Sequence, residues 1–254
     1  GAHVVSTYKK RYKFSGSFSA DFIVNVSGEK DLPDYSKKND FSVRWSHSQD
    51  QKANPDQTFS ASVNFSTSSY NKNNITNRIN PEDLSTNQKS SSINYTRKWP
   101  WNPFRVSVSL MHSQNSRDTT ISLTLPNLKI SSTKAFYPFK PKKLIGSKNN
   151  PLHDIQISYS LNADNKISCK ESELTFKPES FSTLWKNGVQ IPLSVSTNVK
   201  LLKFFTLTPS LIYTERWYFS KTEQYWDKEK NQMVKKKPTP GFNRAYDYSV
   251  SAST

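Results

Sequence analysis

The feature that most constrains this chain is a serine or threonine at every second position, with an apolar residue between. Residues 14–22 read Phe-Ser-Gly-Ser-Phe-Ser-Ala-Asp-Phe, and residues 59–66 and 105–110 repeat this pattern. Side chains of an extended strand point alternately to its two faces, so each segment has one apolar and one hydroxylated face. The pattern predicts β-strands throughout, and helical periodicity is almost absent.

The second face of these strands carries mostly small hydroxyls and amides, whereas the charged residues gather in the connections. A soluble sandwich alternates too, but its polar face usually presents Lys, Glu and Arg to water. Small polar groups on one face and apolar groups on the other suit strands between lipid and a polar lumen. We therefore predict an all-β fold, an antiparallel transmembrane β-barrel. Residues 1–254 are expected to form part of a single barrel domain and to supply about ten to twelve of its strands.

Composition narrows the function classes. The 254 residues are 33% hydrophobic, and no apolar run reaches the roughly 18 residues of a membrane-spanning helix, which excludes a helical membrane protein. The net charge of +16 indicates an acidic partner such as nucleic acid, anionic lipid or acidic glycan. The basic clusters at residues 9–11, 140–143 and 235–237 form no nucleic-acid-binding motif, so we expect no nucleic acid partner.

The lengths of the connections predict an orientation. Short connections at residues 9–11, 99–103 and 203–205 are expected to be periplasmic, and long ones at residues 28–39, 71–88, 165–188 and 220–244 external. This parity holds only if residues 119–132 form one strand through Pro126, which we favour. A turn at Pro126-Asn127 would invert the second half of the chain.

No set of residues predicts catalysis or a cofactor. The histidines His3, His47, His112 and His153 lack metal-ligand spacing, and no phosphate loop or nucleophile elbow occurs. Cys169 is expected to be an inert thiol in a polar connection. We predict no catalytic residue, no metal site and no cofactor, and therefore not an enzyme.

The alternation assigns individual side chains to faces. Asp21 is in register with the serines of its strand, and a carboxylate facing lipid would be costly, so this face is expected to line the lumen. The predicted lumen-facing residues are Ser15, Ser17, Ser19, Asp21, Arg44, Ser60, Ser62, Ser107, Ser109, Ser194, Ser196 and Lys200. The predicted lipid-facing residues are Phe18, Phe22, Val63, Phe65, Val108, Leu110, Val195 and Leu211. Residues 214–219, Thr-Glu-Arg-Trp-Tyr-Phe, are expected to place a cation beside rings at a strand end, at the membrane interface.

Two alternatives share these patterns. A soluble or cell-surface β-sandwich that binds acidic glycans would also have alternating strands and positive charge. Another outer-membrane barrel, such as a porin or nutrient receptor, would have the same wall.

Longer sequence segments favour one protein family. Residues 41–55, Phe-Ser-Val-Arg-Trp-Ser-His-Ser-Gln-Asp-Gln-Lys-Ala-Asn-Pro, and their continuation at 59–71 resemble the barrel of the LptD family of lipopolysaccharide (LPS) assembly proteins. The similarity is to the Bacteroidetes-type form. Residues 122–128, 137–140, 202–210 and 213–219 resemble further stretches of it, so the similarity runs from about residue 8 onward.

The resemblance implies a translocon in the bacterial outer membrane. Such a barrel receives LPS from periplasmic Lpt bridge components and releases it to the outer leaflet. The partners it implies are LPS, an LptE-like plug lipoprotein, the Lpt bridge and outer-membrane lipids. The family's periplasmic jellyroll and the cysteine pairs of proteobacterial relatives are not found in residues 1–254.

Overall fold

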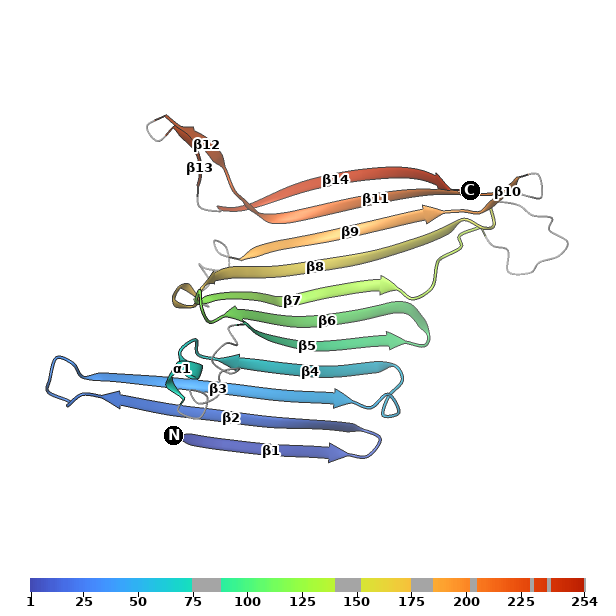
Figure 1. Ribbon diagram of the computed structural model, residues 1–254. Coiled ribbons are helices and arrows are strands. Elements are labelled where there is room, and N and C mark those ends of the chain that lie inside the picture. The colour runs from blue at the N-terminus through green and yellow to red at the C-terminus, as the bar shows by residue number, and fades with distance from the viewer. Residues whose placement is uncertain are drawn as a thin grey trace. The chain divides into compact units, whose positions relative to one another are not determined.

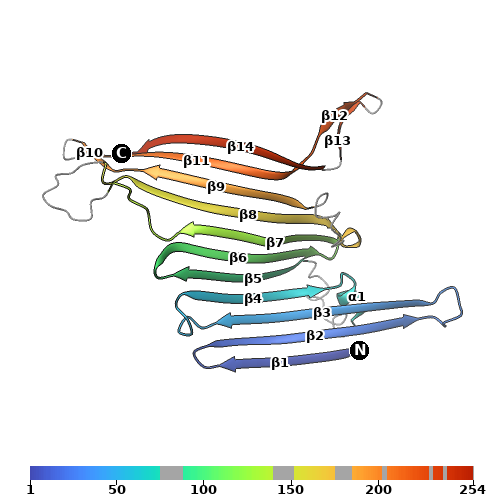
Figure 2. The ribbon, with the colours of Figure 1, turned by 180° about the vertical axis from the view of Figure 1, so that it is seen from behind.

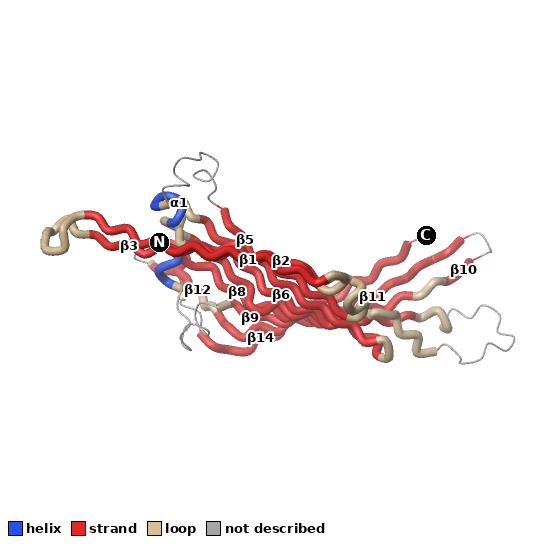
Figure 3. Tube along the Cα trace, turned by 90° about the horizontal axis from the view of Figure 1, so that it is seen from below, coloured by secondary structure: helices blue, strands red, loops and turns tan. Residues whose placement is uncertain are grey.

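The computed structural model describes residues 1–74, 88–139, 152–174, 185–201, 205–228, 231–236 and 239–253, and most of them lie in antiparallel strands. Strands dominate the trace in Figure 3, where they are red. The strands are β1 (Ala2–Lys10), β2 (Phe14–Ser27), β3 (Ser36–Gln49), β4 (Gln57–Ser66), β5 (Gln88–Trp99), β6 (Asn102–Asn115), β7 (Thr120–Ser132), β8 (Gln156–Lys170), β9 (Lys186–Ser196), β10 (Val199–Leu201), β11 (Phe205–Lys221), β12 (Gln224–Asp227), β13 (Gln232–Lys235) and β14 (Thr239–Ser253). The helices are α1 (Tyr70–Asn73) and the 3-10 turn η1 (Glu171–Glu173).

Twelve of the strands form one sheet in the order β1-β2-β3-β4-β5-β6-β7-β8-β9-β11-β10, with β14 paired to β11. Strands β12 and β13 form a separate hairpin. Among the described residues this order does not return to β1, so the sheet is not closed. The predicted antiparallel all-β class is confirmed. The described strands do not divide into the two packed sheets that the sandwich alternative requires.

The chain divides into two compact units. Unit 1 comprises Gly1–Arg97, Val108–Pro126 and Asn165–Trp185, and unit 2 comprises Lys98–Ser107, Asn127–Asp164 and Lys186–Thr254. Each unit is described by itself below.

Strands β1 to β4 form a meander in unit 1, and they lie side by side in Figures 1 and 2. The turn between β1 and β2 is closed by a hydrogen bond from the backbone N–H of Lys13 to the carbonyl of Lys10, 3.0 Å long. Tyr12 takes a positive φ of 59° in this turn. The backbone N–H of Asp50 donates to the carbonyl of Lys13 at 2.9 Å, which ties the β3–β4 connection to the β1–β2 turn.

A tyrosine crosses this meander and joins three strands. Tyr8 lies opposite Gly16, and Gly16 lies opposite His47. The tyrosine hydroxyl meets His47 Nδ1 at 2.9 Å and accepts a 2.8 Å hydrogen bond from Trp45 Nε1. A Cβ on Gly16 would overlap the Tyr8 ring and the carbonyl of Ser46. Glycine is therefore needed here so that the ring can pass over β2, and we call Tyr8, Trp45 and His47 the aromatic clip.

Strand β7 passes through Pro126, which confirms the single-strand prediction. Asparagine side chains donate hydrogen bonds on either side of the proline, one to a backbone carbonyl and one to a carboxylate. Asn165 Nδ2 donates to the carbonyl of Leu125 at 2.6 Å in unit 1, and Asn127 Nδ2 donates to the Asp164 carboxylate in unit 2. Side chains thus supply hydrogen bonds at the point where proline removes a ladder donor.

The buried apolar cluster of unit 1 lies on β7 and β8. Ile121, Leu123 and Ile167 pack with Trp185, and Cys169 packs against this cluster. Strand β8 extends to Lys170, so the expectation that Cys169 lies in a polar connection is wrong. Alternation places Cys169 on the same face of β8 as Ile167, where it acts as a small apolar residue.

In unit 2, β11 is the central strand between β9 and β14, and β10 pairs with its first residues. Residues 220–244 were expected to be one long loop. They instead contain the β12–β13 hairpin and the start of β14, so Arg244 lies within a strand. No helix in the described part of the chain is long and apolar enough to cross a membrane.

The clip makes Gly16 sensitive to substitution. We expect Gly16→Ala to lower the free energy of unfolding by roughly 1–3 kcal/mol, because the added methyl displaces the Tyr8 ring or the strand. Urea titration of the protein folded in detergent measures this change. Gly188→Ala is the matched control, since its Cβ would meet nothing closer than 3.5 Å. Equal unfolding midpoints for the two variants would contradict the role of Gly16.

The base of the β12–β13 hairpin should respond to pH. Lys236 Nζ donates to Glu223 at 3.2 Å, and Lys221 Nζ lies 3.6 Å from the same carboxylate. The hydrogen bond from Lys236, and then the charges of both lysines, lower the pKa of Glu223. A carboxylate with a lowered pKa stabilises the fold above its unfolded value, and this contribution is lost as the pH falls through the folded value.

We therefore expect the hairpin to loosen below about pH 4. The ¹⁹F NMR signal of fluorotryptophan at Trp226 follows this change. The Glu223→Gln variant should show a smaller pH response of that signal, and an unchanged response would contradict the assignment.

Candidate functional site

The strand registers of unit 1 gather hydroxyl side chains into rows across the sheet. One row joins neighbouring positions on five strands: Thr7, Ser17, Ser46, Ser62 and Ser92. The next row is Lys9, Ser15, Ser48, Ser60 and Asn94. The hydroxyls of Ser17 and Ser46 hydrogen-bond to each other at 2.8 Å. We call this side the hydroxylated face of unit 1.

The predicted lumen residues of unit 1 share this face. Ser19 lies opposite Arg44, and Asp21 lies opposite Ser42. Ser109 belongs to the same side, because its β6 neighbours Met111 and Ser113 line a hollow with Ser62. Ser107 has the same parity on β6 as Ser109 but belongs to unit 2, so its face stays a prediction. Whether this face lines a lumen stays a prediction.

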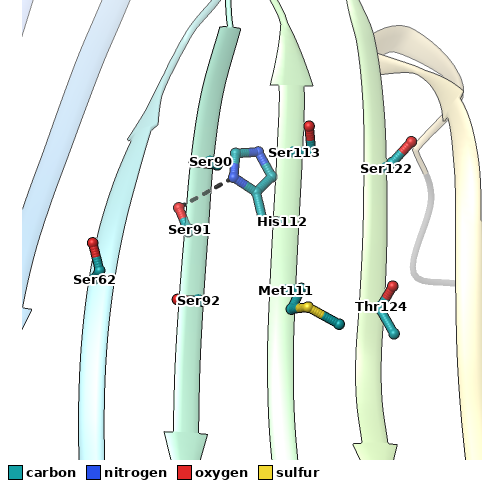
Figure 4. Close-up of a pocket in the computed structure, with 9 residues that line it drawn as sticks. All are labelled: Ser62, Ser90, Ser91, Ser92, Met111, His112, Ser113, Ser122 and Thr124. Atoms are coloured by element: carbon teal, nitrogen blue, oxygen red, sulfur yellow. Dashed lines mark hydrogen bonds between the residues drawn. The ribbon is translucent and has the colours of Figure 1, made fainter.

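A hollow of about 340 Å³ opens on β4 to β7, and Figure 4 shows its lining. The lining residues are Ser62, Ser90, Ser91, Ser92, Met111, His112, Ser113, Ser122 and Thr124. All but Met111 and His112 carry a hydroxyl. We call it the serine hollow. Its hydroxyls can donate and accept hydrogen bonds without adding charge, which suits sugar hydroxyls.

Sequence reasoning missed Ser90, Ser92, Ser113, Ser122 and Thr124 as members of one site. These residues follow the same alternation of hydroxyl and apolar residues from which Ser60 and Ser62 were predicted to face the lumen. What the pattern lacks is the register between strands, which decides which serines become neighbours.

His112 lies at the edge of the serine hollow. Its Nδ1 is 3.2 Å from the Ser91 hydroxyl, and its ring packs edge-on against Phe65 with the centroids 5.0 Å apart. Its Nε2 is buried with no hydrogen-bond partner among the described atoms. No group of three His, Cys, Asp or Glu side chains in the described residues is arranged to hold a metal ion.

Beyond the serine hollow, side-chain hydrogen bonds between β4 and β5 replace the backbone hydrogen bonds of their ladder. The paired register ends at Ser62 opposite Ser92. Past that point, the Ser91 hydroxyl accepts from the backbone N–H of Asn64 at 3.0 Å and lies 3.2 Å from its carbonyl. Lys89 Nζ donates to the Ser66 hydroxyl, and both side chains are buried. A polar network therefore replaces backbone pairing at this end of the two strands.

Residues 67–74, which include α1, lie over the hydroxylated face of β2 and β3. Asp40 is fully buried beneath them and accepts hydrogen bonds from Thr67 Oγ1 at 2.8 Å, from Asn73 Nδ2 at 2.6 Å and from the Ser69 hydroxyl. Asn25 Nδ2 donates to the carbonyl of Asn73 at 3.2 Å. Burial raises the pKa of Tyr70. We call residues 67–74 the covering segment, and one carboxylate holds it in place.

Unit 2 has a hydroxylated face of its own. Ser196, Ser210 and Ser251 lie in one row, and the last two hydrogen-bond to each other at 2.7 Å. Ser194 has the same parity as Ser196 on β9. Lys200 joins this side, because it lies opposite Thr206 of β11. Arg216 forms an ion pair with Asp247 on the same face.

The apolar residues form matching rows on the opposite face of each unit. In unit 1, Phe18, Trp45 and Val63 lie in register. Phe22 and Phe65 belong to the same face, opposite Phe41 and Val43. Val108 and Leu110 have the parity of His112 on β6, which contacts Phe65. In unit 2, Val195, Leu211 and Val250 form a row, and Leu211 is 43% exposed. Such exposed apolar surface needs an apolar environment.

One carboxylate interrupts the apolar face of unit 2. Glu215 has the parity of Leu211 on β11, yet its side chain is only 15% exposed. It accepts hydrogen bonds from Trp217 Nε1 at 2.6 Å and Tyr213 Oη at 3.3 Å, and it forms an ion pair with Arg244 of β14. Alternation along β11 divides the predicted group between the two faces. Arg216 and Tyr218 share the hydroxylated face, whereas Trp217 and Phe219 point to the apolar face, where Arg244 lies opposite Trp217.

A long sheet with one hydroxylated and one apolar face is typical of the wall of an outer-membrane β-barrel. Comparison with protein families matches residues 1–254 to the LptD protein family. The chain belongs to that family, which confirms the resemblance seen in its sequence segments. Comparison with curated proteins finds no match.

Family membership supports a role in LPS transport and assembly. LptD-type proteins are outer-membrane proteins of Gram-negative bacteria, and membership implies LPS binding and interaction with the Lpt pathway. The family is one of transport and assembly, not one known for catalysis.

The anchoring of the covering segment can be tested by proteolysis. We expect Asp40→Ala to speed trypsin cleavage after Lys72 by roughly tenfold or more, since the buried donors of Thr67, Ser69 and Asn73 lose a charged acceptor. Asp34→Ala, in the exposed β2–β3 connection, is the control and should leave the rate unchanged. Equal cleavage rates in the two variants would show that Asp40 does not hold the segment.

Proposed function

We propose that this chain forms part of the wall of the LPS translocon barrel in the outer membrane. In this role, the hydroxylated faces line the lumen and the apolar faces meet lipid. Within each unit, the predicted lumen residues other than Ser107 and the eight predicted lipid residues fall on opposite faces, which supports this assignment. The observation that carries the proposal is the row of hydroxyls from Thr7 to Ser92.

The chemistry of this wall suits a polar saccharide in transit. Neutral hydroxyls offer many similar weak hydrogen bonds, so a sugar can exchange one partner for the next without being held. The phosphates of lipid A are the groups that charged residues bind tightly. Basic residues are concentrated at strand ends and connections, for example Lys9, Lys10 and Arg11, and are sparse along the rows.

The proposal includes the partners of such a barrel. LPS arrives from periplasmic Lpt bridge components, an LptE-like lipoprotein plugs the lumen, and outer-membrane lipids surround the wall. No catalytic step is required, because translocation changes the position of LPS and breaks no bond.

Site-specific photocrosslinking in cells tests the lumen. We expect a benzoylphenylalanine in place of Ser62 to crosslink LPS, because Ser62 lies in the central hydroxyl row. The same probe at the neighbouring Val63 should not, since adjacent strand residues face opposite ways. LPS crosslinking at Val63 and none at Ser62 would reverse the assigned faces. Normal surface LPS after depletion of the full-length protein would remove the proposed function altogether.

The lipid face has its own test. We expect Val108→Arg to lower barrel stability in a bilayer by roughly 2–4 kcal/mol, because the guanidinium would face hydrocarbon. Ser107→Arg, one residue away, should be tolerated because it would face the polar side. Urea titration in lipid vesicles measures both variants. Preferential labelling of Ser107→Cys over Val108→Cys by a lipid-soluble reagent would contradict the assignment.

A further inference from the structure

A second hollow, of about 300 Å³, lies at the turn between β1 and β2 and is not explained by a wall for LPS. Its lining comes from both faces of the sheet and from the turns: Lys9, Ser15 and Ser48 belong to the hydroxylated face, Lys10 and Phe14 to the apolar face, and Arg11, Tyr12 and Asp50 to the turns. We call it the turn hollow. Three cations and one carboxylate line it, so its lining carries net positive charge. Tyr12 and Phe14 supply an aromatic edge.

The single carboxylate of the turn hollow is already engaged by its own turn. Asp50 Oδ1 accepts a 2.9 Å hydrogen bond from the backbone N–H of Lys52. None of the ion pairs among the described residues involves Lys9, Lys10 or Arg11. The cations therefore remain available to an external anion.

Tyr12 holds two cationic side chains beside the turn hollow. The Arg11 guanidinium lies 4.7 Å from the centre of the Tyr12 ring, and its Nη2 donates to the Tyr12 hydroxyl at 2.8 Å. Lys52 Nζ lies 5.1 Å from the same ring. A cation stacked on an aromatic face is partly pre-positioned, which lowers the entropy lost when it binds an anion.

The apolar side of the same turn has the features of a membrane interface. Phe14 lines the turn hollow and also contacts the Tyr8 and His47 rings, at 6.0 and 5.7 Å between centroids. Within the aromatic clip, the Trp45 indole N–H, the Tyr8 hydroxyl and His47 Nδ1 find hydrogen-bond partners, as surroundings with little water favour. Amphipathic rings concentrate at the level of lipid headgroups, where phosphates also lie.

We propose that the outer edge of the turn hollow, formed by Lys10, Arg11 and Tyr12, binds the phosphate of an anionic phospholipid headgroup, with the acyl chains lying along Phe14 and the apolar face. This rests on the proposed function, which places the apolar face in lipid. The site would anchor the short-turn end of β1 and β2 to the leaflet next to it. Each Lys or Arg near an anionic membrane surface adds to the attraction, so a small cluster is enough for a measurable preference.

The test is native mass spectrometry of the full chain in detergent, titrated with phosphatidylglycerol or phosphatidylcholine. We expect a preference for phosphatidylglycerol of about tenfold or more. Replacing Lys9, Lys10 and Arg11 by Gln should reduce this preference to near unity. Replacing Lys30, Lys37 and Lys72 by Gln removes the same charge elsewhere and should leave the preference intact. A charge-retaining triple variant, Lys9→Arg, Lys10→Arg and Arg11→Lys, should also keep it.

An unchanged preference in the Gln variant of the turn would overturn the proposal, as would an equal loss in the control variant. The proposal would also be overturned if inorganic phosphate displaced bound phosphatidylglycerol as effectively as free phosphatidylglycerol does. The site would then recognise the anion alone and not the lipid. The proposed function is tested by a separate experiment, the crosslinking of LPS to a probe at position 62. If the unchanged chain shows no lipid preference while the probe at Ser62 still crosslinks LPS, only the turn-hollow proposal is refuted. If the lipid preference is present while Ser62 does not crosslink LPS, only the proposed translocon wall is refuted.

Discussion

The structure depends on one constraint, the two-residue period of side chains in paired strands. A slip of one residue between two strands would move every serine of one strand to the apolar side and every phenylalanine to the polar side. The register must therefore be fixed strand by strand. The hydroxyl pair Ser17–Ser46 and the row of Phe18, Trp45 and Val63 fix it from opposite faces in unit 1. Both the polar and the apolar rows follow from that single alignment.

Two groups of polar side chains on the apolar faces are tolerated because they find hydrogen-bond partners within the sheet. In unit 1, the aromatic clip joins an indole N–H, a phenol and an imidazole in one chain of hydrogen bonds. In unit 2, Glu215 is surrounded by Trp217, Tyr213 and Arg244. An unpaired polar group in an apolar environment costs several kcal/mol, whereas a satisfied one can remain. On β11 and β14 the Arg216–Asp247 pair lies on the other face, so ion pairs join these two strands from both sides.

The faces of individual strands could be predicted from the sequence because they depend only on local alternation. Passage of β7 through Pro126 could be predicted as well, since the alternation resumes at Leu128. Features that depend on distant partners could not. Asp40 holds residues about 30 positions away, and α1 is too short to show helical periodicity. Gly16 was predicted only as part of the alternating segment 14–22, because the need for glycine there depends on Tyr8 of the neighbouring strand. Arg244 was expected in a loop because its pairing strand precedes it by about 30 positions.

The distribution of charge separates two kinds of surface on the same meander. The hydroxylated rows run across five strands with few charges, so the contacts they offer are weak, numerous and alike. The turn hollow at the end of these strands concentrates Lys9, Lys10 and Arg11 around a rigid tyrosine. A wall that must release its cargo is better served by the first arrangement, because a tight contact at any one row would become a trap. A strand end that must stay at a fixed depth is better served by the second, because charge-assisted contacts with phosphate resist displacement. In the two proposed roles, the positions of the serines suit a moving cargo and the positions of the lysines suit a fixed lipid.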